Sequence, residues 1–278
     1  AFNDYVRFVG DKIGVVAACD QETAERAARL VEVEYEELPF SIGFDDTLAG
    51  KNCLEGETPV RDEYTLEVGK KQESTEGLIE VCSTMELPRL HHATMETHAC
   101  IADYDPYSDM LTVYCPNQAV HGIRTVLADF LEMPESHVRV VKATMGGSFG
   151  AKQEWFLEPV TALVAKKLCR PVKLVYSRGE AMTDTIVRGA MRMSARGYYT
   201  PDGEMKEIYC DVTLDAGAYI GNAGDYVRAL AGKPTRCYRI PYMHYHGQVI
   251  SSNSPVSGAF RSWSAAEEAL ICLLYTSP

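Results

Sequence analysis

The amino-acid sequence predicts an α+β fold with a large mixed sheet, and three observations lead to this prediction. Short apolar stretches recur along the chain, either continuous, as at residues 13–18, or strictly alternating, as at residues 31–35; both patterns are typical of strands. Residues 120–131 and 154–168 instead carry apolar side chains at helical spacing. With 46% hydrophobic residues, the 278-residue chain can bury a sizeable core, in one large domain or two.

The first 38 residues predict a small α/β unit. Its expected strands are residues 6–9, 13–18 and 31–35. Asp20 is the expected N-cap of a helix over residues 23–30, which is rich in alanine. Residues 45–77 are polar and contain several glycines, so we expect a connector with little regular structure there.

From Leu78 onward the pattern predicts a second, larger domain. Pro134 follows the end of the helix over residues 120–131, and Pro201-Asp202-Gly203 is typical of a hairpin turn. The expected strands are residues 78–85, 97–104, 111–114, 138–141, 172–176, 190–199, 205–214 and 248–251.

The stretch Met-Gly-Gly-Ser-Phe-Gly-Ala-Lys-Gln-Glu at residues 145–154 lies between an expected strand and an expected helix. A glycine-rich turn in this place exposes backbone N–H groups, which suit an anion or an oxo group. It is not a Walker loop, because Ala151 and Gln153 flank Lys152, and it does not match G-x-G-x-x-G. A tight turn that only packs a helix on a sheet is the structural alternative.

This loop and five further segments, in the same order, resemble the molybdenum-binding large subunit of the xanthine dehydrogenase and aldehyde oxidase family. The loop is similar to the family signature Gly-Gly-x-Phe-Gly-x-Lys. The resemblance covers nearly the whole chain. The other matching segments are His-x-x-Met-Glu within residues 90–98, the strand ending in Gln at 114–118, the run at 170–180, Asp-Ala-Gly-Ala-Tyr at 215–219 and the segment 253–261.

The resemblance implies a division into domains. Residues 1–46 would be the C-terminal part of a small α/β hammerhead domain, and residues 47–77 a connector. Residues 78–271 would form an incomplete first molybdenum cofactor-binding domain with a large mixed sheet. Residues 272–278 do not resemble the family and would be the end of an incomplete reading frame or an artificial addition.

Members of this family hydroxylate an electron-poor carbon of an N-heterocycle or an aldehyde with oxygen from water. The resemblance implies a molybdenum–molybdopterin cofactor, expected in its cytosine dinucleotide form, with no protein side chain bound directly to the metal. Iron–sulfur and FAD partners, on other domains or subunits, would carry the electrons away. The family's general-base glutamate is expected downstream of these residues, so the 278 residues alone are expected to bind no molybdenum and to be inactive.

The resemblance also implies which residues lie at the cofactor and the substrate. Gln118 would donate its amide N–H to a molybdenum oxygen. Gly147 and Gly150 belong to the loop, where the Gly150 N–H would reach the oxo group, and Phe149 would exclude water. Without the resemblance, a glutamine after a strand is usually a surface residue and a phenylalanine usually a core residue.

Gln153 and Arg261 are expected to contact the substrate. Many purine-oxidising relatives carry Glu at the position of Gln153, and an amide can bind a heterocycle edge without adding charge. Arg261 would stabilise negative charge that grows on a heterocycle; the alternative is a surface ion pair. Together they favour an N-heterocycle such as a purine, while xanthine, nicotinate and aldehydes all stay open as substrates.

Two further features modify this interpretation. His91, His92 and His98 with Glu96 suggest a metal cluster, since alternate residues of a strand share one face, but the resemblance makes the segment structural. After Arg261, Ser-Trp-Ser at residues 262–264 replaces the usual Gly-[Phe/Tyr]-Gly, which puts the pterin-facing geometry in doubt. Serine in place of cysteine after Arg261 disfavours the copper-containing carbon monoxide dehydrogenases.

Composition excludes several other classes. The net charge of −12 argues against nucleic-acid binding, and nine scattered cysteines without C-x-x-C argue against a disulfide framework, an iron–sulfur cluster or a structural zinc. We find no membrane-length apolar run and no signal peptide. We therefore expect a cytoplasmic protein with a small-molecule substrate, oligomeric when intact. The alternatives are a non-catalytic binding or assembly module with the same fold and an unrelated glycine-rich α+β domain.

Overall fold

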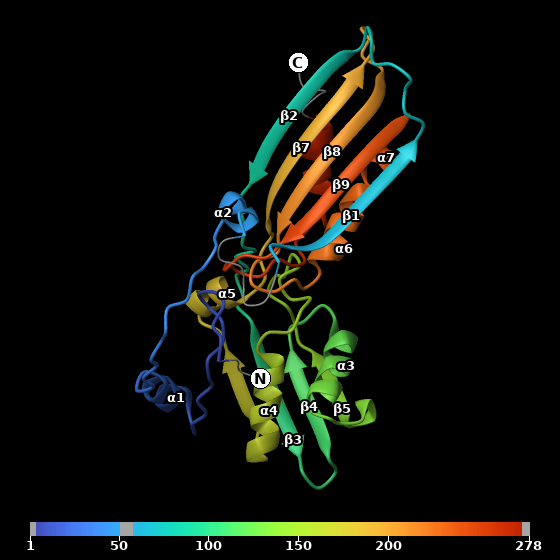
Figure 1. The fold of residues 1–278 in the computed structure, drawn as a ribbon. Coiled ribbons are helices and arrows are strands. Elements are labelled where there is room, and N and C mark those ends of the chain that lie inside the picture. Colours follow the sequence, from blue (N-terminus) through green and yellow to red (C-terminus); the bar gives the residue numbers. More distant parts are fainter. Residues whose placement is uncertain (1–3, 51–57, 274–278) are drawn as a thin grey trace. The chain divides into compact units, whose positions relative to one another are not determined.

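The computed structural model describes residues 4–50 and 58–273, in two compact units (Figure 1). The first unit comprises residues 1–38 and 92–185, and the second comprises residues 39–91 and 186–278. Each unit contains one mixed sheet, so the α+β class is confirmed, with the expected strands divided between two sheets. Most of the expected tail, 272–278, lies outside the described residues.

The sheet of the first unit has the strand order β5-β4-β3-β6. Its strands are β3 (Ala99–Asp105), β4 (Met110–Cys115), β5 (Val138–Lys142) and β6 (Val172–Val175). β4 and β5 run parallel, whereas the other neighbours are antiparallel. The helices α3 (Val120–Phe130) and α4 (Glu158–Leu168) share one hydrophobic core with β3 and β4, because their buried residues form a single cluster.

Two short helices complete this part of the first unit. The 3₁₀ helix η1 (Glu135–His137) precedes β5, and α5 (Arg178–Asp184) follows β6. α5 begins with a capping box, in which the Ser177 hydroxyl accepts from the Glu180 N–H and the Glu180 carboxylate accepts from the Ser177 N–H. The Ser-Arg-Gly-Glu sequence carries this signature, which the sequence analysis did not use.

The N-terminal segment of the first unit differs from its prediction. α1 (Gln21–Ala28) is present, and Asp20 caps it by accepting from the Thr23 N–H at 2.8 Å. The strands expected at 6–9, 13–18 and 31–35 are wrong, since none of the described residues 4–38 is in a strand. An apolar pattern indicates only that a segment favours the strand conformation. A strand also needs a neighbouring strand to which it is hydrogen-bonded. The apolar run at 13–18, predicted to be buried, is largely exposed.

The sheet of the second unit has the strand order β1-β9-β8-β7-β2. Its strands are β1 (Val60–Gly69), β2 (Ile79–Leu87), β7 (Ala190–Tyr199), β8 (Met205–Asp215) and β9 (Tyr242–Ile250). β8 and β9 run parallel and the other pairs antiparallel. One face packs against α6 (Ala223–Ala231), as Figure 1 shows; the remaining helices are α2 (Phe44–Leu48), α7 (Pro234–Cys237) and α8 (Ala265–Leu273).

The prediction of a connector with little regular structure at 45–77 is wrong, because the helix α2 and the ten-residue strand β1 form there. In β1 the side chains of Tyr64, Leu66 and Val68 pack against the core, and the alternate positions carry Glu63, Thr65 and Glu67. The many charges hid this alternation in the sequence. β9 is likewise longer than the strand expected at 248–251.

A buried carboxylate organises one end of the second unit. Asp215 ends β8 and accepts from the Gly217 N–H at 2.9 Å and from the Ser252 hydroxyl at 2.8 Å. The Arg89 guanidinium lies 2.6 Å from the same carboxylate and also donates to the Pro255 carbonyl at 3.1 Å. The Asp-x-Gly part of the matched motif is therefore a structural junction within this unit.

Gly217 is required at this junction for two reasons. Its φ is +79°, in the left-handed region, and a Cβ there would lie 2.2 Å from the carbonyl oxygen of Pro255. We expect Gly217→Ala to destabilise the chain by at least about 2 kcal/mol, because backbone strain and overpacking add. Gly232→Ala is the matched control, since Gly232 has a φ of −87° and open space around it. Urea unfolding measures the stability of the two variants. Equal unfolding midpoints for Gly217→Ala and Gly232→Ala would contradict the requirement for glycine at position 217.

Candidate functional site

The glycine-rich loop and Gln118 lie at the same edge of the first unit's sheet. The loop, residues 145–153, follows β5, and Gln118 follows β4. Because β4 and β5 are parallel neighbours, their carboxyl ends meet at one edge, a common place for ligand sites. A hydrogen bond of 2.7 Å from the Gln118 N–H to the Lys152 carbonyl joins the two segments.

The loop has an unusual backbone. Gly147 and Gly150 have φ values of +102° and +109°, which glycine adopts readily. Phe149 between them has a φ of +55°, which costs a bulky residue about 1–3 kcal/mol, and it is 50% exposed. Strain combined with an exposed ring is typical of a functional loop and does not fit the core residue that an isolated phenylalanine would suggest.

Four consecutive backbone N–H groups of the loop, those of residues 147–150, have no hydrogen-bond partner among the described residues. Ser148 and Gly150 are nevertheless buried. Most buried N–H groups in proteins are paired, and a row of free donors in a glycine-rich turn forms a concavity for anions or oxygen ligands. The loop can therefore bind a group that accepts hydrogen bonds.

An ion pair between a buried lysine and a partly exposed glutamate holds the loop in this conformation. The Lys152 ammonium, whose side chain is 1% exposed, pairs with Glu96, and the same carboxylate oxygen accepts from the Gly146 N–H at 2.9 Å. Burial raises the pKa of Glu96, but the bonds from Lys152 and Gly146 outweigh it and leave that pKa below its ordinary value. The sequence pattern places Glu96 only near the histidines and gives no sign of this pair, because the two residues are 56 positions apart.

The histidine segment supports the loop as well. His98 is buried and its Nε2 donates to the Ala151 carbonyl at 3.0 Å. The prediction that His92, Glu96 and His98 share the face of a strand is wrong, because residues 91–98 lie outside any strand and β3 begins only at Ala99. The Glu96 side chain instead turns to Lys152. Within residues 4–50 and 58–273, no three His, Cys, Asp or Glu residues are grouped as metal ligands.

The side chain of Gln118 is fixed by one residue of the loop. Its Oε1 accepts from the Ser148 hydroxyl, and the Ser148 oxygen accepts from the Lys152 N–H at 3.1 Å. Gln118 is exposed, and its Nε2 has no partner among the described residues. Ser148 stands at the variable position of the signature, so the motif gave no reason to select it; a hydroxyl within a glycine-rich turn was the available signal.

The two expected substrate residues lie in different units. Gln153 is exposed in the first unit, and its side chain has no hydrogen-bond partner in the described part of the chain. Arg261 is exposed in the second unit, where its carbonyl accepts from the Arg188 guanidinium at 2.7 Å. The other four expected site residues, Gln118, Gly147, Phe149 and Gly150, belong to the first unit.

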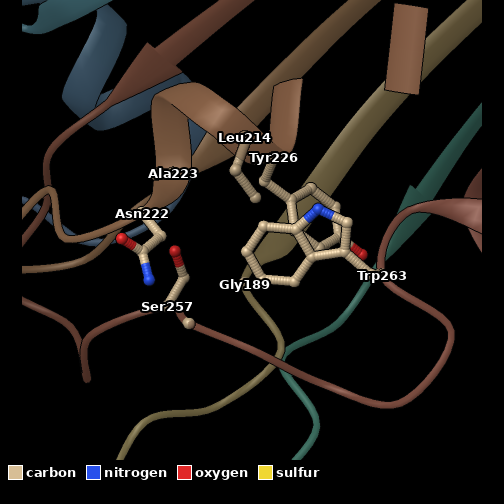
Figure 2. A pocket seen from close by; sticks show the side chains of 8 residues that line it. Gly189, Leu214, Asn222, Ala223, Tyr226, Ser257 and Trp263 are labelled. Carbon is tan, nitrogen blue, oxygen red and sulfur yellow. The ribbon is translucent and has the colours of Figure 1, made fainter. Parts of the chain in front are cut away.

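A small pocket in the second unit lies beside the segment that follows Arg261 (Figure 2). The Trp263 ring meets the Tyr226 ring edge to face, with centroids 5.0 Å apart. Ser262, Trp263 and Ser264 have φ values of +89°, +32° and +66°. Positive φ at three consecutive non-glycine residues is an unusual backbone. The lining residues are Gly189, Leu214, Asn222, Ala223, Tyr226, Ser257, Gly258 and Trp263.

The Glu96–Lys152 pair makes a testable prediction. Glu96→Ala leaves a buried ammonium without its partner and should cost about 3–5 kcal/mol, whereas Lys152→Met removes the charge and should cost less. Glu135→Ala breaks the half-exposed pair with Arg124 and should cost under about 1 kcal/mol. Unfolding free energies of the three variants at pH 7 test this order; equal losses for Glu96→Ala and Glu135→Ala would contradict it.

The Glu96–Lys152 pair also makes the stability of the fold depend on pH. Since the pKa of Glu96 is lowered on folding, its ionised form stabilises the fold above the unfolded glutamate pKa of about 4.3. This contribution is lost as the pH falls through the lower folded pKa. The free energy of unfolding of the Glu96→Ala variant should therefore be lower than that of the parent chain chiefly above about pH 4.3. In acid the two free energies should converge.

Comparison with known proteins identifies the family. The model of the molybdopterin cofactor-binding domain matches residues 57–272, and that of the aldehyde oxidase and xanthine dehydrogenase a/b hammerhead domain matches residues 2–39. The chain is 31% identical to the xanthine dehydrogenase molybdenum-binding subunit of Escherichia coli O157:H7, over 95% of this chain and 35% of that relative. It is 30% identical to the nicotinate dehydrogenase large molybdopterin subunit of Eubacterium barkeri, over 97% and 64%.

The chain thus spans about one third of the first relative's length and somewhat under two thirds of the second's. Among solved structures, the aldehyde oxidoreductase from Desulfovibrio gigas matches with a TM-score of 0.87 at 22% identity, over 93% of this chain and 29% of that one, which shows a common fold. None of the helices within the described residues has the length and apolar character needed to cross a bilayer. The family matches over residues 2–39 and 57–272 show that this chain belongs to the xanthine dehydrogenase and aldehyde oxidase family of molybdopterin-binding proteins.

Proposed function

We propose that this chain is part of a molybdenum hydroxylase large subunit and that its glycine-rich loop holds the molybdenum–molybdopterin cofactor. The observation that carries this proposal is the row of N–H groups at residues 147–150, which have no partner among the described residues, next to the likewise unpaired Nε2 of Gln118. Both lie at the carboxyl edge of β4 and β5. The intact protein would hydroxylate an N-heterocycle such as a purine, or an aldehyde, with oxygen from water.

The donors of this site fit such a cofactor. The molybdenum group carries oxygen atoms, which accept hydrogen bonds, and the N–H groups of residues 147–150 and the Gln118 NH₂ group are donors that could bind them. When bound, the cofactor supplies the oxygen-transfer and two-electron chemistry. The chain's own residues would then orient it: the Gly147 and Gly150 N–H groups and the Gln118 amide by hydrogen bonding, and Phe149 by excluding water.

Gln153 and Arg261 would act on the substrate in the intact protein. The free amide of Gln153 can both donate to and accept from a heterocycle edge. A guanidinium at Arg261 would stabilise the negative charge that develops on an electron-poor ring. These two side chains favour an N-heterocycle over a simple aldehyde.

The remaining parts of the proposal follow from the family. We assign the cytosine dinucleotide form of the cofactor, iron–sulfur and FAD partners as electron acceptors, and a cytoplasmic location. We also propose residues 1–46 as a partial hammerhead domain and residues 78–271 as part of the first cofactor-binding domain. The general-base glutamate would lie on a segment outside this chain.

The direct experiment uses the intact subunit with its electron-transfer partners. It should contain molybdenum and oxidise an N-heterocycle in ¹⁸O-labelled water, with ¹⁸O incorporated into the hydroxylated product. A panel of purines, nicotinate and aldehydes identifies the substrate class. A purified, fully assembled protein that lacks molybdenum, or that oxidises none of these compounds, would refute the proposal and favour the non-catalytic module.

The role of Gln153 predicts a substrate-dependent loss. Gln153→Ala removes one or two hydrogen bonds to a heterocycle, each worth about 0.5–1.5 kcal/mol, so kcat/KM for heterocycles should fall roughly 2- to 150-fold. A simple aldehyde, which has no ring edge to bind, serves as the internal control and should be turned over at the parent rate. Steady-state kinetics on both substrates distinguishes this from a structural role, for which both values would fall equally.

A further inference from the structure

We propose that Ser148 is a positioning residue that fixes which end of the Gln118 carboxamide faces away from the loop. This inference rests on the proposed function, because it concerns the donor that Gln118 would offer to the cofactor. A carboxamide has a donor end and an acceptor end of nearly the same shape. The protein around it must therefore select one orientation, and here a single hydroxyl makes that selection.

The direction of the hydrogen bonds follows from the neighbours of Ser148. The Lys152 N–H donates to the Ser148 oxygen at 3.1 Å, so the hydroxyl already acts as an acceptor there. Its proton is then free to donate, and its acceptor is Oε1 of Gln118. If the amide turned over, Nε2 would donate to the Ser148 oxygen instead, and the buried Ser148 proton would lose this acceptor. The cost of leaving this buried hydroxyl proton without an acceptor favours the observed orientation.

Further contacts hold Lys152 and Gln118, the two hydrogen-bond partners of Ser148. Lys152 is buried and paired with Glu96, which fixes the N–H that donates to Ser148. The carbonyl of the same Lys152 accepts from the Gln118 N–H at 2.7 Å. Gln118 is thus connected to the loop twice, through its main chain to Lys152 and through its side chain to Ser148.

The consequence is that the Gln118 side chain presents a hydrogen-bond donor. With Oε1 engaged by Ser148, the Gln118 side chain presents its NH₂ group, which has no partner among the described residues. This NH₂ then acts together with the free N–H groups of residues 147–150. Without the hydroxyl, the amide can present its oxygen instead, and that oxygen would repel an oxygen atom of the bound group. Ser148 would thereby act on the cofactor through Gln118.

A double-mutant cycle in the intact, molybdenum-loaded subunit tests this positioning role. Ser148→Ala should lower kcat by about twofold at most, because the amide would still present its NH₂ group about half of the time, with a smaller change in KM; Ser148→Thr, which keeps a hydroxyl, should restore most of the rate. In a Gln118→Ala background, Ser148→Ala should have no further effect. The electron paramagnetic resonance spectrum of the reduced enzyme is the second readout, and Ser148→Ala should change it only when Gln118 is present.

Each outcome is decisive. Equal losses from Ser148→Ala in both backgrounds, or no loss in either, would overturn the positioning role while leaving the function of the loop intact. Failure of Ser148→Thr to restore rate and spectrum, with molybdenum content unchanged, would also overturn it. If Gln118→Ala alone changed neither the rate, the spectrum nor the molybdenum content, the proposed contact of Gln118 with the cofactor would itself be wrong, and this inference with it.

Discussion

The ion pair between Lys152 and Glu96 is the interaction on which the candidate site depends. A nearly fully buried ammonium is stable only with a close partner, and that partner comes from the segment before β3. The pair also excludes a side chain at Gly146, where a Cβ would lie 2.7 Å from the Cβ of Glu96. Once the loop is closed in this way, its free N–H groups and the Ser148 hydroxyl acquire fixed directions.

The second unit uses its matched motifs differently, to join two chain segments. The Ala218 N–H donates to the Ser254 carbonyl at 2.9 Å, and the Ser257 N–H donates to the Ala216 carbonyl at 2.8 Å. The Asp-Ala-Gly-Ala-Tyr segment and the segment that leads to Arg261 therefore support each other around Asp215. A family signature in this chain thus marks two kinds of residue, those of the loop with its unpaired N–H groups and those that brace one chain segment against another.

Sequence alone predicted the elements whose signals are local. β3, β4, β5, β7 and β8 follow their apolar patterns, and Asp20 caps α1 because an N-cap depends on neighbouring residues only. The N-terminal strands failed since a strand also requires a partner that its own sequence does not specify. β1 was missed because its charged positions masked the alternation, although the sheet accepts them on its outer face.

The site was predictable in its location and only partly in its chemistry. The motifs selected the loop and Gln118, since glycines at fixed spacing are visible in one dimension. Glu96 and Ser148 lie 56 and 30 residues from their side-chain partners Lys152 and Gln118, so only the folded chain shows that they meet. The directions of the free donors likewise depend on backbone angles, such as the φ of +55° at Phe149, that no residue pattern reports.

A crystal structure of the intact, cofactor-loaded subunit is the measurement that tests this account most directly. The account predicts oxygen atoms of the cofactor within hydrogen-bonding distance, about 2.7–3.2 Å, of Gln118 Nε2 and the Gly150 N–H, with the Glu96–Lys152 pair intact. A cofactor held elsewhere, with both donors bonded to protein or solvent and more than about 4 Å from any cofactor atom, would contradict it.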